Sequence, residues 1–210
     1  MENTPEKVLI VGLGNPGKEY KRNRHNTGFM LIDALAKEAG IRVGRAKSRS
    51  LAGEGTLYGA PAVLAKPHTY MNESGNAVAS LLKVYRIDLG RLLVAHDDLD
   101  LPFGTIRMRA GGGSAGHKGV ESINRSLGTG DYVRLRIGIG RPPGNMDAAD
   151  YVLEDFDRQQ EEELPFVLDL AVKAVKTWIT EGLAQAMNVY NNARISNNLY
   201  ESYRKDRQAS

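Results

Sequence analysis

Short apolar runs rich in β-branched residues alternate along this 210-residue chain with longer segments whose apolar residues recur at helical spacing, and this alternation limits the fold more than any other feature. Residues 8–11 and 92–95 are typical of buried strands, whereas residues 27–39 and 164–179 are typical of helices with one buried side. Strands that alternate with helices favour a sheet covered by helices. We therefore expect an α/β fold with a mixed β-sheet flanked by helices.

The remaining elements are predicted by the same criteria. Strands are expected at residues 57–65, 105–109 and 132–139, and helices at residues 77–85, 119–127 and 184–190. Four glycines fall within residues 110–116, which predicts an irregular loop. Because the chain is long enough for one well-buried core but short for two, we assign a single domain to residues 1–192. Residues 193–210 are expected to form a polar, partly disordered tail.

Cysteine is absent from the sequence, which excludes disulfides, thiolate nucleophiles and cysteine-ligated metal centres. No run approaches the roughly 18 apolar residues that a membrane-spanning helix needs. The N-terminus also lacks the apolar stretch of a signal peptide. We therefore expect a soluble, cytoplasmic protein without a membrane partner.

The formal net charge of +3 is too small to indicate a nucleic-acid partner by itself, but the charge is unevenly distributed. Basic residues outnumber acidic ones by nine to three in residues 18–49 and by seven to two in residues 101–141. Residues 147–169 carry nine acidic residues and one arginine, a pattern typical of a solvated helix face. The basic segments contain the glycine-rich and histidine-containing motifs, which favours an anionic ligand there.

Residues 12–17 read GLGNPG directly after a predicted strand and match the G-x-G-x-x-G pattern of dinucleotide-binding domains. That pattern requires a helix that begins within the glycines, so that the helix N-terminus meets the pyrophosphate. Residues 18–24, which follow, have no apolar helical face. A dinucleotide-binding oxidoreductase is therefore a disfavoured alternative.

Polar residues stand where predicted strands end. Asn15 follows the first strand and Asp97 follows residues 92–95, while Asn72 comes after Pro67 and His25 precedes the first helix. Ligands of open α/β sheets bind beyond the carboxyl ends of the strands, so these side chains are expected to converge. A histidine backed by a carboxylate can activate water, and neutral asparagines can orient substrate or water.

A metal site is the alternative chemistry for this region, with His96, Asp97, Asp98 and Asp100 as its ligands. Consecutive residues of a strand point to opposite faces, and no H-x-H or H-E-x-x-H spacing is present. The sequence therefore predicts a site without metal.

Five ordered motifs resemble those of bacterial peptidyl-tRNA hydrolases, and the resemblance extends from Val8 to about Tyr190. The motifs are VGLGNPG at 11–17 with Tyr20 and RHNTG at 24–28, KP at 66–67 with TYMN at 69–72 and SG at 74–75, VAHDDLDLP at 94–102, GGG at 111–113 with Gly116, His117 and Gly119, and RLRIGIGRP at 134–142.

The resemblance implies a peptidyl-tRNA hydrolase-like (phosphorylase/hydrolase-like) fold and a monomeric esterase that needs neither metal nor cofactor. Such an enzyme releases the peptide from prematurely dissociated peptidyl-tRNA, which it recognises by the acceptor stem and the terminal CCA. By motif, His25 is implied as the catalytic base and Asp97 as its partner. Asn15 and Asn72 are implied to hold the peptide and the attacking water.

The same motifs imply the binding residues. Substrate-binding positions are Tyr20, Tyr70, Met71, Asn72, His117 and Lys118, with His117 in a glycine-rich loop that gates the cleft. Arg109 and Arg136 match a basic pair that clamps the tRNA terminal phosphate, a task suited to the planar guanidinium.

Two positions depart from the family pattern. Lys118 stands where asparagine is common and His68 where threonine is usual, and we have no explanation for His68. Lys118 is expected to reach the tRNA backbone beside Arg107, Arg109 and Arg125. The main alternative function is a non-catalytic RNA-binding relative, of the kind that assists plant organellar intron splicing. The joint presence of the four residues implied in catalysis disfavours it.

Overall fold

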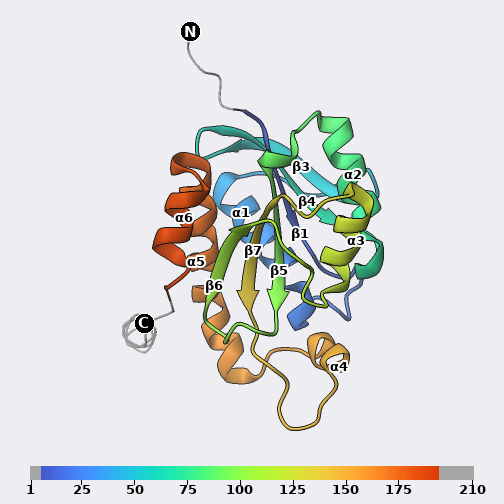
Figure 1. The fold of residues 1–210 in the computed structure, drawn as a ribbon, viewed down its shortest axis with the longest axis vertical. Helices are drawn as coiled ribbons and strands as arrows, with labels where there is room; N and C mark the ends of the chain where they lie inside the picture. The colour runs from blue at the N-terminus through green and yellow to red at the C-terminus, as the bar shows by residue number, and fades with distance from the viewer. Residues whose placement is uncertain (1–5, 194–210) are drawn as a thin grey trace.

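The computed structural model describes residues 6–193, and its centre is a seven-stranded sheet (Figure 1). The strands are β1 (Val8–Gly12), β2 (Arg45–Lys47), β3 (Ser50–Leu57), β4 (Ala60–Pro67), β5 (Leu92–Asp98), β6 (Ile106–Ala110) and β7 (Val133–Gly138), in the order β2-β3-β4-β1-β5-β7-β6. Strands β4, β1, β5 and β7 are parallel, whereas β2, β3 and β6 are antiparallel to their neighbours. The predicted mixed sheet is confirmed.

Helices cover both faces of this sheet. Helices α1 (Thr27–Ala39), α5 (Arg158–Glu181) and α6 (Leu183–Tyr190) lie on one face, and α2 (Ser74–Tyr85) and α3 (Lys118–Leu127) lie on the other (Figure 1). The short helix α4 (Ala148–Leu153) lies beyond the arrowheads of β5 and β7. The described residues also contain three 3-10 turns: η1 (Arg24–Asn26), η2 (Met71–Glu73) and η3 (Leu89–Arg91).

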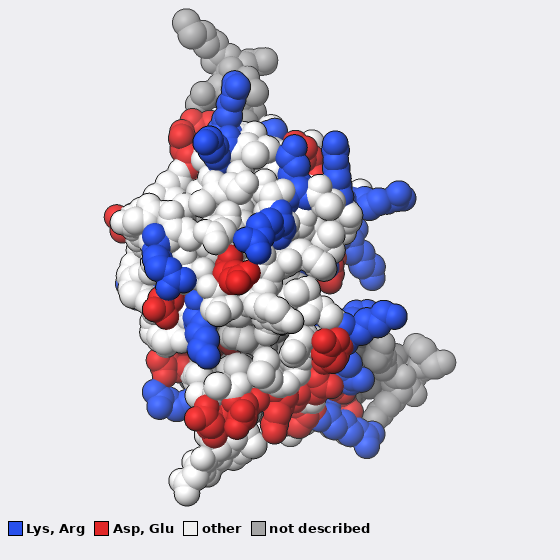
Figure 2. All heavy atoms as spheres, turned by 90° about the vertical axis from the view of Figure 1, so that its right-hand side faces the viewer, with Lys and Arg blue, Asp and Glu red and all other residues white. Residues whose placement is uncertain are grey.

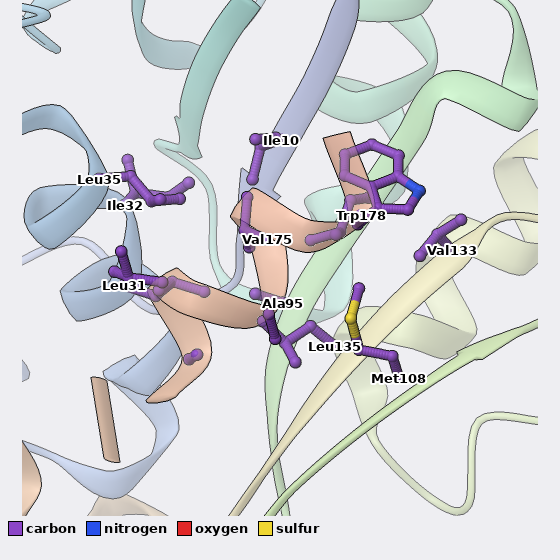
Figure 3. Close-up of a cluster of buried hydrophobic side chains, with 14 of the residues drawn as sticks. Ile10, Leu31, Ile32, Leu35, Ala95, Met108, Val133, Leu135, Val175 and Trp178 are labelled. Carbon is purple, nitrogen blue, oxygen red and sulfur yellow. The ribbon is translucent and has the colours of Figure 1, made fainter. Parts of the chain in front are cut away.

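The core has two parts because successive strand residues point to opposite faces. Ile10 of β1 packs with Leu31, Leu135 and Trp178 beneath α1 and α5 (Figure 3). Its neighbours Leu9 and Val11 belong to the cluster beneath α2 and α3. Strand β1 is central and buried on both faces, which explains why residues 8–11 form an unbroken apolar run.

One predicted strand is wrong. Residues 57–65 are divided between β3 and β4, which form a hairpin whose turn residues Tyr58 and Gly59 have φ of 50° and 84°. Two positive φ values match the twist of the flanking strands. The polar strand β2 and the helix α4 were not predicted.

The other predicted elements are present, most of them with changed ends. Helix α5 starts six residues before the predicted position, at a capping box in which Asp157 and Gln160 satisfy each other's backbone N–H groups. The predicted tail lies outside the described residues, apart from its first residue. Within residues 6–193, no helix combines the length and apolar character needed to cross a membrane.

The charge polarity expected from the sequence is visible on the surface. On the face drawn in Figure 2, acidic side chains gather in the lower part, at the level of α4 in Figure 1, and Lys and Arg are spread mainly over the upper part. The acidic residues of the segment 147–169 fall on and around α4 and the first turns of α5.

Candidate active site

A cavity of about 930 Å³ opens beyond the carboxyl ends of β1 and β5. Its walls come from the loop after β1, the turns η1 and η2, the glycine-rich loop, the start of α3, and α4. Eight of the residues expected at the site line it: Asn15, His25, Tyr70, Met71, Asn72, Asp97, His117 and Lys118. The convergence predicted from strand ends is confirmed.

Two glycines bring His25 to this place. A Cβ on Gly12 would lie 2.0 Å from the Gly28 carbonyl oxygen, and a Cβ on Gly28 would lie 2.5 Å from the Ala95 oxygen. Only glycine allows β1, the start of α1 and the end of β5 to approach so closely. The turn η1, directly before α1, is thereby held against the end of β5.

This packing also decides against the dinucleotide alternative. The Phe29 N–H in the first turn of α1 donates to the Leu13 carbonyl at 3.2 Å, and the Leu13 N–H donates to the Ala95 carbonyl at 2.9 Å. A pyrophosphate would need free N–H groups at this helix end. The glycines of residues 12–17 therefore pack strand against helix.

The other side of η1 is held by α4 and α5. The Arg24 guanidinium lies 4.1 Å from the ring centre of Tyr151 and donates to Gln160 Oε1 at 3.0 Å. The Asn23 side chain donates to the carbonyl of Leu153. These contacts could not be predicted from the sequence, because they join residues more than 120 positions apart and α4 lies in the acidic segment.

His25 and Asp97 are in direct contact. His25 Nδ1 lies 2.9 and 3.0 Å from the two carboxylate oxygens, and the Asp97 side chain is 2% exposed. A ring that donates from Nδ1 keeps a lone pair on Nε2. Burial alone would raise the pKa of Asp97, but the charges and hydrogen bonds of His25 and His117 outweigh it and lower that pKa. The carboxylate is therefore ionised.

His117 contacts the same carboxylate through the oxygen that is nearer to His25. Its Nε2 lies 3.0 Å from Asp97 Oδ1. Its Nδ1 accepts hydrogen bonds from the backbone N–H groups of Gly119 and Val120 at 3.2 and 3.3 Å, which makes His117 the N-cap of α3. The sequence placed His117 at the cavity without indicating this contact.

The metal-site alternative does not match the geometry. Asp98 forms an ion pair with Arg136 and Asp100 forms one with Arg141. His96 is buried and its Nδ1 donates to the Asp97 carbonyl at 2.7 Å. Burial, reinforced by the charge of His117, lowers the pKa of His96 to about 3.

A different cluster, His25, Asp97 and His117, has potential ligand atoms within 4.8 Å of one another. A metal on His117 Nε2 would move the ring proton to Nδ1, where it would face the two N–H groups of α3. The arrangement therefore fits hydrogen bonding better than metal ligation.

Asn15 is held on both its backbone and its side chain. Asn26 accepts from the Asn15 N–H at 2.8 Å and donates to the Asn15 carbonyl at 3.0 Å. Asn15 Oδ1 accepts from the Met71 N–H at 2.9 Å. The Nδ2 amide group of Asn15 is thus the donor available to a ligand. We did not assign a role to Asn26 from the sequence, although it adjoins His25.

Part of the rim of the cavity is apolar. Tyr70 is 64% exposed, Leu153 43% and Met146 36%, and all three line the cavity. Asn72 lines it as an exposed residue of η2. Tyr20 is the exception among the expected residues: it is half-buried in the loop before η1 and is not among the lining residues of the described chain.

Four arginines share one face of the sheet at β6 and β7. Arg107 is paired with Arg136 and Arg109 with Arg134, and directly opposite residues point to the same face. Arg107 and Arg109 are exposed, whereas buried Arg134 donates to the carbonyls of Gly112 and Gly113. Burial, and the charges of Arg109 and Arg136, lower the pKa of Arg134. The expected pair Arg109 and Arg136 therefore lies within a larger basic face.

Comparison with known proteins identifies the family of the chain. The family model described as peptidyl-tRNA hydrolase matches residues 9–198. The peptidyl-tRNA hydrolase of Chloroflexus aurantiacus is 52% identical over 184 residues, which is 87% of this chain and 98% of that protein. The peptidyl-tRNA hydrolase of Frankia casuarinae is 50% identical over 183 residues, 87% of this chain and 93% of the other.

A solved structure shows the same fold. The crystal structure of peptidyl-tRNA hydrolase from Acinetobacter baumannii superposes with a TM-score of 0.86 at 36% identity, over 93% of this chain and 100% of that one. The sequence matches and the structural match each span most of both proteins. The chain therefore belongs to the peptidyl-tRNA hydrolase family.

Proposed function

We propose that this protein hydrolyses the ester bond between peptide and tRNA in peptidyl-tRNA, with His25 as the base that activates water. The observation that carries this proposal is the contact of His25 Nδ1 with buried Asp97, at a cavity whose wall also presents the amide donor of Asn15. The carboxylate sets the tautomer that leaves Nε2 free to accept a proton.

In the proposed reaction, His25 Nε2 takes a proton from water as the water oxygen bonds to the ester carbonyl carbon. Amide donors at the cavity, with Asn15 Nδ2 foremost, stabilise the negative charge that develops on the carbonyl oxygen. The bond to the ribose oxygen of the terminal adenosine then breaks. The imidazolium of His25 returns its proton to that oxygen, and free peptide and free tRNA result.

The two parts of the substrate match different surfaces. The apolar rim of Tyr70, Met146 and Leu153 suits peptide side chains, which an unsubstituted aminoacyl-tRNA lacks. Arg109 and Arg136 suit the phosphates of the acceptor stem and the terminal CCA, where guanidinium groups bind phosphate oxygens in pairs. Asn72 and Met71, which line the cavity, are proposed to contact the peptide or the water, whereas Tyr20, which does not line it, has no proposed contact.

We further propose that one copy of the chain works in the cytoplasm without metal or cofactor, recycling tRNA from peptidyl-tRNA that left the ribosome early. All groups needed for the reaction come from a single chain, and none of the proposed steps requires a cation.

The test is hydrolysis of N-acetyl-aminoacyl-tRNA, with the same aminoacyl-tRNA lacking the acetyl group as the matched control. We expect release of free tRNA from the blocked substrate only, and the same rate after the protein has been dialysed against a chelator. Binding of tRNA without any release would instead support the non-catalytic alternative.

A further inference from the structure

Asp97 accepts hydrogen bonds from two histidines at once. Oδ1 lies 2.9 Å from His25 Nδ1 and 3.0 Å from His117 Nε2, and the two rings are 4.9 Å apart between centres. We propose that His117 is a positioning residue that holds Asp97 in place for His25 through a hydrogen bond donated by its Nε2–H group. This inference rests on the proposed function and adds to it a third member of the catalytic hydrogen-bond chain.

The start of α3 decides which nitrogen of His117 carries the proton. A neutral imidazole has one N–H group and one lone pair. The N–H groups of Gly119 and Val120 both point at Nδ1, so the lone pair must be there. The proton is consequently on Nε2, which faces the Asp97 carboxylate. The helix N-terminus thus selects the tautomer that can donate to Asp97.

His117 is itself held by the glycine-rich loop. Its backbone N–H donates to the Ser114 carbonyl at 3.0 Å, and Arg134 donates to the carbonyls of Gly112 and Gly113 earlier in the same loop. Hydrogen bonds of Arg134 therefore connect the basic face on β6 and β7 to the loop that carries His117.

The effect on His25 follows from the sharing of one carboxylate. A carboxylate that already accepts from His117 has less negative charge to offer the imidazolium of His25. Removing the His117 donor should let Asp97 stabilise that imidazolium more, and should also free the carboxylate to rotate. Loss of this bond should therefore change the pH dependence of hydrolysis as well as its rate.

Other charged groups around His25 are few and accounted for. His96 is on the same strand as Asp97, and Lys118 adjoins His117 at the start of α3. On the remaining wall Arg141 pairs with Asp100, and Asp147 caps α4. Asp98 pairs with Arg136. Only His25 and His117 among the described residues have a side-chain hydrogen bond to the Asp97 carboxylate.

The variant His117→Asn separates the two roles of His117. Asparagine is a favoured N-cap, so its oxygen can still accept from the first turn of α3, but its side chain is too short to reach Asp97 as well. We expect an unchanged melting temperature and a kcat reduced by up to about tenfold, the equivalent of one lost hydrogen bond, with KM nearly constant. The acid limb of the kcat/KM profile should move up by roughly half a pH unit or more, the equivalent of one lost hydrogen bond.

The variant His117→Ala is the comparison, because it loses the cap as well as the bond to Asp97. It should show the same shift of the acid limb together with a lower melting temperature. If His117 served only to cap α3, His117→Asn would retain the wild-type rate and pH profile, and the proposal would be overturned.

A second measurement uses the wild-type protein. The protein has four histidines, so ¹⁵N-histidine NMR can resolve the ring nitrogens of each. We expect His117 to be the Nε2–H tautomer in the free protein, and a proton on Nδ1 would contradict the inference. Wild-type protein that fails to hydrolyse N-acetyl-aminoacyl-tRNA would overturn the proposed function, whereas an active wild type with the wrong His117 tautomer would overturn this inference alone.

Discussion

Asn15 Oδ1 accepts the backbone N–H of Met71 at 2.9 Å, and this one bond determines which end of the Asn15 amide faces the cavity. With the oxygen engaged, the Nδ2 group is available to donate to a substrate carbonyl. The bond also ties the loop after β1 to the turn η2, two segments 56 residues apart in sequence.

The variant Asn15→Asp tests this orientation with almost no change in shape. An aspartate still accepts from the Met71 N–H, but its second oxygen puts negative charge where a donor stood. We expect kcat to fall about a hundredfold or more, as for the loss of one donor to a developing oxyanion, with little change in melting temperature. Activity near that of the wild type would show that Asn15 does not contact the reacting carbonyl.

The variant His25→Ala should remove most hydrolysis while tRNA binding persists. The loss of a general base costs on the order of a hundredfold or more in kcat. Binding of deacylated tRNA to the variant is the control, because it requires a folded protein and an intact basic face. Near-normal turnover of N-acetyl-aminoacyl-tRNA would remove His25 from the mechanism.

Replacement of Arg109 or Arg136 by glutamine should weaken tRNA binding and flatten its dependence on salt. Each lost phosphate contact lowers the slope of log K against log salt by about one unit or less. Arg136 also pairs with Asp98, so its replacement is expected to have the smaller electrostatic effect. Lys37→Gln, in the last turn of α1 and far along that helix from His25, is the matched control. An unchanged slope for both arginine variants would contradict the clamp.

His96 should make the protein less stable in acid. Burial, reinforced by the charge of His117, lowers the pKa of His96 from 6.5 to about 3, so the unfolded chain binds a proton in this range that the folded chain does not. The free energy of unfolding therefore falls as pH drops below about 6.5, by at most ~1.4 kcal/mol per pH unit from this residue. His96→Gln should reduce that slope in urea unfolding at pH 6.5, 5.5 and 4.5. Equal slopes in both proteins would contradict the burial argument.

The sequence predicts the parts of this molecule that depend on local pattern or on sheet topology. The helix α1 was predicted with its bounds, because its apolar spacing is regular and Gly40 ends it with a positive φ. The meeting of His25 with Asp97 followed from the rule that ligand sites lie at the carboxyl ends of parallel strands. The first prediction uses local spacing, and the second uses a topological rule that brings together residues 72 positions apart.

The missed features depend on contacts that no local pattern contains. The turn at Tyr58 and Gly59 interrupts an apolar run that continues through both strands of the hairpin. The bond between His117 and Asp97 depends on how a loop of several glycines folds back over 20 residues. Helix α4, which supplies Leu153 to the cavity, lies in an acidic segment interpreted as a solvated helix face.

Lys118 marks the departure from the family pattern, and its position now limits what it can do. It is the first residue of α3, exposed, and part of the cavity wall. An ammonium group only donates, so Lys118 cannot orient water through an accepting oxygen as asparagine can. A positive charge at a helix N-terminus is also unfavourable for the helix, so the residue does not stabilise α3.

We predict that Lys118 attracts the tRNA backbone. Lys118→Ala should raise the KM for peptidyl-tRNA more at low salt than at high salt and leave kcat nearly constant, the pattern of lost uniform binding. Lys118→Arg keeps the charge and should keep the wild-type KM. A large fall in kcat with unchanged KM in Lys118→Ala would place this residue in the chemical step instead.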